Sequence, residues 1–121
     1  PLCNIISKAH GNENEPLQYV LSHPELLNHE IADWAFNLAQ AYFDAIPYLE
    51  VKGQEWYDYN NSAYNLACVA HFVARELKYF SIGIQSMDLQ IKLAQIAGAN
   101  MFVIMGMKND LNMLRKMAGS R

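Results

Sequence analysis

The apolar positions of this chain recur with the period of an α-helix, and one helical pattern returns at nearly equal intervals. Residues 35–39 (AFNLA) are echoed 28 positions later by residues 63–67 (AYNLA), and the Leu-Ala pair at 93–94 lies 27 positions beyond the pair at 66–67. A spacing of this size fits one long helix and a turn. We therefore expect an all-α fold: a helical bundle of three long helices that meet through layers of Leu and Ala. One or two short N-terminal helices precede them, in a single domain over residues 1–121.

The first long helix is expected between Ser22 and Ile46. Upstream, residues 2–9 suit a short helix or an ordered arm, and Pro16 suits the first turn of another short helix. Ser22 and Glu25 have the spacing of a capping box, in which the hydroxyl accepts from a backbone amide and the carboxylate reaches back. Pro47 disfavours helical geometry at the residue before it, so the helix should end there.

The second long helix is expected from about residue 54 to residue 80, after a connection whose turn residue is Gly53. Its apolar positions alternate in steps of four and three, which is a heptad seam. The seam consists of Tyr59, Ala63, Leu66, Ala70, Val73, Leu77 and Phe80. The opposite side of this helix carries Asn65, Cys68, His71, Arg75 and Lys78. A short turn around Gly83 should follow.

The third long helix is expected from a cap at Ser86 to about Ala118, and its middle is unusually apolar. Residues 96–107 contain one polar side chain, Asn100, and are too short for the ~20 residues that cross a bilayer, so we expect no membrane span. Such a segment suits the centre of the bundle, a subunit interface or, less readily, a buried strand. For the interface we single out Gly98, Met101, Phe102 and Met105, because methionines adapt to a partner and glycines, including Gly106, admit a second backbone.

Aromatic residues gather around the connection between the first two long helices. Tyr48, Trp56, Tyr57 and Tyr59 stand there with Asp58 among them. Tyr and Trp are enriched where proteins meet partners, and the acidic setting favours a basic protein partner. The alternative is that these side chains close the end of the bundle.

Charge is divided unevenly along the chain. Residues 1–60 carry two bases and nine acids (2 − 9 = −7), and residues 61–121 carry seven bases and three acids (7 − 3 = +4). Oppositely charged halves favour packing of one half on the other, or head-to-tail association between chains. Carboxylates at helix starts and bases at a helix end would give the same pattern. With an isoelectric point near 5.7, nucleic acid is not an expected partner.

No assembled catalytic or cofactor motif stands out, and we expect no cofactor. His29 and Asp33 lie one turn apart in a segment that begins like a zinc-protease helix, but the second histidine is missing. Cys68 and His71 share a helix face without a nucleophile turn. With Cys3, the chain has two cysteines and no disulfide framework, so a reduced, cytoplasmic setting is expected.

These observations favour a non-catalytic protein–protein interaction module, such as a small adaptor, a chaperone-like subunit or an inhibitor or immunity-type protein. We expect it to form a homodimer through its last helix. The alternative is a small enzyme, or a ligand- or metal-binding bundle, with a pocket between helices near His29, Cys68 and His71.

Overall fold

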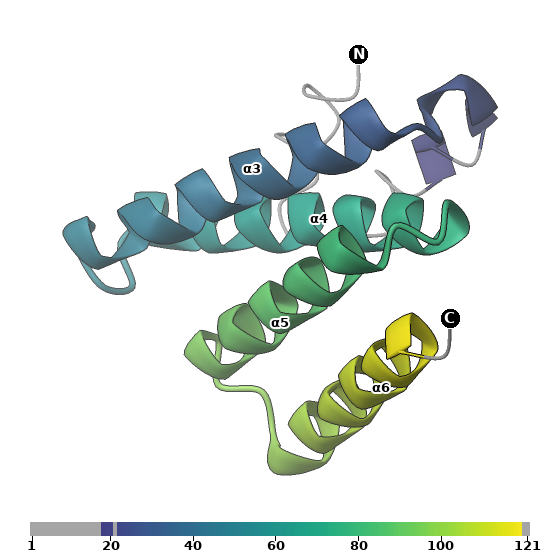
Figure 1. Ribbon diagram of the computed structural model, residues 1–121. Helices are drawn as coiled ribbons and strands as arrows, with labels where there is room; N and C mark the ends of the chain where they lie inside the picture. The colour runs from purple at the N-terminus through teal and green to yellow at the C-terminus, as the bar shows by residue number, and fades with distance from the viewer. Residues whose placement is uncertain (1–17, 21, 120–121) are drawn as a thin grey trace.

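The computed structural model describes residues 18–20 and 22–119, which form helices joined by short turns (Figure 1). The elements are η1 (Pro24–Leu26), α3 (His29–Ala45), η2 (Ile46–Tyr48), α4 (Gln54–Glu76), α5 (Phe80–Ile96) and α6 (Met101–Gly119), where η marks a 3-10 helix. These residues contain no β-strand, so the predicted all-α bundle is confirmed and a strand over 96–107 is not formed. Residues 18–20 and 22 are also helical, whereas the helix predicted over 2–9, the start at Pro16 and Cys3 lie outside the described residues.

The helices stack in chain order. α3 and α4 form an antiparallel pair, α5 packs across α4, and α6 runs back antiparallel along α5 (Figure 1). Most of the packing of α6 is against α5, and α6 stands at the edge of the bundle. The last helix therefore has a neighbour on only one side.

The main core lies between α3, α4 and α5. Ala32, Ala35 and Ala39 of α3 are fully buried, which lets this helix approach the Leu66 and Val73 side chains of α4 closely. The predicted seam of α4 is confirmed from Tyr59 to Leu77, both partly buried. Phe80, its predicted last member, instead begins α5 and packs in a second core cluster with residues of α5 and α6. Of the Leu layer, Leu66 and Leu93 are buried and Leu38 is partly buried. Truncating Leu66 to Ala is expected to cost about 2–5 kcal/mol.

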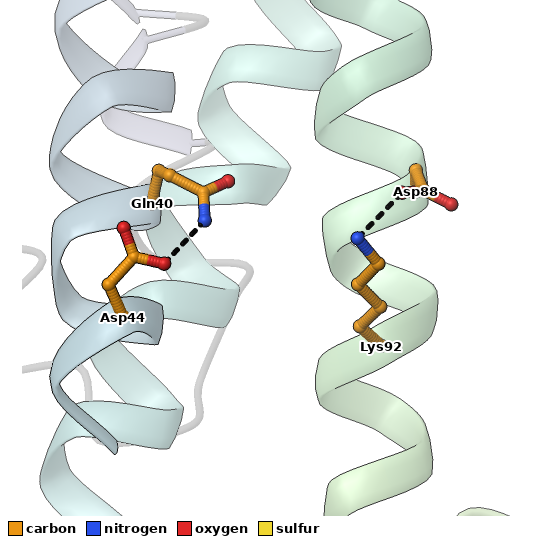
Figure 2. A network of polar contacts seen from close by, with 4 residues as sticks. All are labelled: Gln40, Asp44, Asp88 and Lys92. Atoms are coloured by element: carbon orange, nitrogen blue, oxygen red, sulfur yellow. Dashed lines mark hydrogen bonds and ion pairs between the residues drawn. The ribbon is translucent and has the colours of Figure 1, made fainter. Parts of the chain in front are cut away.

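The solvent faces of α3 and α5 are polar. Figure 2 shows Gln40 of α3 donating to the Asp44 carboxylate at 2.8 Å, and Lys92 of α5 paired with Asp88 at 3.2 Å. Both pairs join residues four positions apart on one helix, where such contacts are worth about 0.3–0.5 kcal/mol each. The outer sides of these two helices are thus built for contact with water.

The first long helix begins later than predicted. The Ser22 hydroxyl donates to the Gln18 carbonyl at 3.0 Å, because Ser22 belongs to the preceding helical segment, and it caps nothing. The chain then turns through η1, and Asn28 caps α3 instead: its Oδ1 accepts from the Ile31 amide at 2.9 Å. The predicted capping box at Ser22 is wrong.

The turn after α4 also lies elsewhere than predicted. α4 ends at Glu76, and Lys78 takes a left-handed φ of 57°. The Tyr79 amide donates to the Ala74 carbonyl at 2.7 Å and the Lys78 amide to the Arg75 carbonyl at 3.1 Å, which together form a Schellman motif. Gly83, the predicted turn residue, instead lies inside α5, where an added Cβ would come within 3.8 Å of the Ala74 Cβ.

The predicted third long helix is two helices. Gly98 has φ +81°, its amide donates to Gln95, and the Ala99 amide donates to Ala94, so the same motif ends α5. Asn100 then caps α6 by accepting from the Val103 amide at 3.0 Å. Ser86 is fully buried within α5 and caps no helix.

Candidate interaction surface

Helix α6 exposes most of its apolar side chains. Only Ile104, Leu111 and Leu114 of its 19 residues are buried, and they pack on α5. The exposed fractions of its large apolar side chains run from 44 % for Met117 to 83 % for Phe102. The full set is Met101, Phe102, Val103, Met105, Met113 and Met117. The segment predicted to be core or interface is therefore not the centre of the bundle.

These side chains fall into three rows along the helix, because residues three and four apart share a face. The outer strip, defined here as Phe102, Gly106, Asn109, Met113 and Met117, carries no charge. The row on one side of it consists of Met101, Met105, Lys108, Asn112 and Lys116. The row on the other side consists of Val103, Met107, Asp110 and Leu114.

Two hollows lie beside α6, between it and α4. One, of about 110 Å³, is lined by His71 and Arg75 of α4, Met87 of α5, and Asp110, Met113, Leu114 and Met117 of α6. The other, of about 280 Å³, is lined by residues that include Asn60 and Tyr64 of α4 and Val103 and Met107 of α6. Both are shallow and mostly apolar.

The His71 imidazole lies in the first hollow, where its surroundings lower its pKa. Burial is the main cause that lowers its pKa below the usual 6.5, the neighbouring Arg75 lowers it further, and Asp110 opposes both. The buried Nε2 of His71 has no hydrogen-bond partner. Burial of this imidazole thus disfavours its charged form.

Cys68 and His29 do not share this hollow. The Cys68 thiol is buried and accepts from the Gln90 side-chain amide at 3.1 Å. His29 lies at the start of α3 with its ring centroid 4.8 Å from that of Tyr79. The Tyr79 hydroxyl donates to the Asp33 carboxylate at 2.9 Å, and this hydrogen bond is the main cause that raises the pKa of Tyr79. The hydrogen bond between Tyr79 and Asp33 thus holds the turn before α5 against α3.

Two α4 side chains on the side opposite the predicted seam are buried. Asn65 is fully buried, as is Ser86 on the facing α5, and neither side chain has a hydrogen-bond partner. Cys68 is likewise buried. The heptad pattern of α4 indicates the side that packs on α3. A second side of α4 is buried as well, because α5 packs on it.

The aromatic cluster divides between core and surface. Tyr59 packs edge-on against Tyr42 with centroids 5.0 Å apart, and half-buried Trp56 joins the main core. Tyr48 and Tyr57 are exposed, by 89 % and 47 %. Asp58 accepts from the Gln54 side-chain amide at 2.9 Å. The cluster therefore both closes the bundle end and presents two tyrosines to solvent.

Sequence reasoning named Phe102 and Met105 but missed that Met113 and Met117 continue the same exposed surface. The signal was present, because positions 102, 106, 109, 113 and 117 follow steps of four and three between rows that carry charges. The start of this helix was missed because one continuous helix was predicted from Ser86 to about Ala118, across the turn at Gly98.

Among residues 18–20 and 22–119, no three His, Cys, Asp or Glu side chains gather closely enough to hold a metal ion. No helix in the described part of the chain has the length and apolar character needed to cross a membrane. Comparison with protein-family models, with curated proteins and with solved structures found no match to this chain.

Proposed function

We propose that this protein is a non-catalytic protein–protein interaction module that self-associates through helix α6. The observation that supports the proposal is the exposed apolar surface of α6, which runs the length of a helix packed on one side only. Large contiguous apolar patches are rare on monomers and mark interaction sites. Burying one such side chain is worth about 1.5–3 kcal/mol, so leaving six of them in water is costly.

Among the described residues, the other helices give no comparable surface. The outer sides of α3 and α5 carry the polar pairs of Figure 2, and the large side chains of their inner sides are in the core. Excess apolar exposure is thus concentrated on the last helix of the described residues. The other exposed large apolar side chains are Tyr48, Val51, Tyr57 and Ile96.

Light scattering coupled to size-exclusion chromatography tests the proposal. One chain has a mass of 13.8 kDa, and the wild-type protein is expected to elute at twice that mass. Phe102→Lys, which places a charge at the most exposed apolar position of α6, should give single chains with unchanged helical circular dichroism. Asn112→Lys, at an exposed polar position of the same helix, should leave the dimer intact. A wild-type mass of one chain at concentrations of hundreds of micromolar would refute self-association.

We also propose that the exposed part of the aromatic cluster contacts a basic protein partner. Tyr48 and Tyr57 are exposed there, and Glu50 and Glu55 line the hollow next to Tyr48. Calorimetric titration with a peptide rich in Lys and Arg should show binding that Tyr48→Ala weakens and Asn37→Ala, on the exposed side of α3, does not. Equal binding by both variants would count against a role for the tyrosine.

A further inference from the structure

Resting on the self-association proposed above, we infer that two copies of this chain pair their α6 helices antiparallel along the outer strip. Phe102 of each copy packs against Met117 of the other, and Gly106 packs against Met113. The two-fold axis then passes between Asn109 and Asp110.

The spacing of the outer strip fits an antiparallel pair. Phe102 and Gly106 are four residues apart, Gly106 and Met113 seven, and Met113 and Met117 four, so these four positions have the same spacing from both ends. Reversing one helix therefore brings each of these four residues opposite another of the four, and it brings Asn109 opposite Asp110 at the axis. A two-fold symmetric interface requires such self-complementarity, because each surface must fit its own copy.

The side chains of the strip also complement one another in size. Gly106 is exposed, and no atom lies within 4 Å of the place where its Cβ would be. A missing side chain there leaves room for Met113 of the second copy, whose flexible thioether adapts to a groove. A parallel pair would instead set glycine opposite glycine and leave a gap.

Charge favours the same direction and the same face. The row that contains Met105 continues into Lys108 and Lys116, and the row that contains Met107 continues into Asp110, so only the outer strip is uncharged for its whole length. Basic residues concentrate toward the end of α6. A parallel pair would set every one of these charges beside its own copy, whereas the antiparallel pair places Lys116 about 20 Å along the helix from its copy. Lys108 and Asp110 lie near the two-fold axis and are not separated in this way.

Disulfide trapping tests the register. In a background with Cys3→Ser, where the remaining Cys68 is buried, Gly106→Cys and Met113→Cys proteins are oxidised separately and as a mixture. The mixture should form a cross-linked dimer at least tenfold more efficiently than either variant alone. In the proposed pair, identical positions lie about 10 Å apart along the helix, beyond the reach of a disulfide.

Other outcomes separate this inference from the proposal on which it rests. If Met105→Cys cross-links to itself and the mixture does not, self-association stands and the antiparallel strip is wrong. If light scattering gives one chain, both fail.

Gly106→Leu gives an independent test that does not depend on cysteine chemistry. It should favour the helix and raise the thermal unfolding midpoint of the dilute protein, yet weaken dimerisation at least tenfold because it fills the room opposite Met113. Dimerisation as tight as in the wild type would overturn the inference.

Discussion

Replacing Lys78 by glycine should stabilise the protein, although it removes a side chain. Lys78 stands at the left-handed position of the Schellman motif that ends α4, with φ 57°. The equivalent position at the end of α5 is Gly98, with φ +81°. The same left-handed turn thus occurs twice, once with glycine, which adopts this conformation without strain, and once with lysine.

The size of the effect follows from two opposing terms. A side chain in the left-handed region costs about 1–2 kcal/mol, which glycine avoids. Glycine loses about 0.4–1 kcal/mol more conformational entropy on folding. The difference between these ranges is a net gain of about 0–1.6 kcal/mol in the free energy of unfolding for Lys78→Gly, with a midpoint of about 0.8 kcal/mol, and Gly98→Ala should lose a similar amount.

Urea unfolding followed by far-ultraviolet circular dichroism, at one fixed protein concentration, measures both changes. Lys92→Gly is the control, because it replaces a lysine within α5 by glycine; it should cost about 1–1.5 kcal/mol, which includes the lost pair with Asp88. If Lys78→Gly destabilises the protein as much as Lys92→Gly does, the left-handed turn is not a source of strain and the reasoning fails.

Two further changes test the caps and the buried histidine. Asn28→Ala should lower the free energy of unfolding by about 1 kcal/mol because it removes the cap of α3, whereas Ser22→Ala should change it little; equal losses in urea unfolding would contradict the assigned cap. Burial lowers the pKa of the His71 imidazole in the folded protein. As the pH falls below 6.5, this imidazole is therefore protonated more readily in the unfolded chain than in the folded one. Wild-type stability should therefore decrease below pH 6.5 by up to about 1.4 kcal/mol per pH unit, and His71→Gln should decrease less; parallel pH profiles in urea unfolding would rule this out.

The helical class and most of the main seam could be predicted from local pattern. Steps of four and three along residues 59–77 indicate an apolar face on an α-helix, and the Leu-Ala layers supply alternating large and small side chains for packing. These patterns are local, so they can be recognised without knowing which helices are neighbours. The apolar character of residues 101–107 was visible in the same way.

The sequence pattern did not indicate the turn at Lys78, and it could not indicate which surfaces remain in water. Lys78 ends a helix without a glycine signal, because two backbone hydrogen bonds hold it in the left-handed region. Asn65 and Cys68 are buried because α5 covers the side of α4 that the heptad pattern leaves open. Phe102 and Met113 are exposed because no further helix packs beyond α6 within the described residues. Burial depends on neighbours that are distant in sequence, and the periodicity of one helix does not specify them.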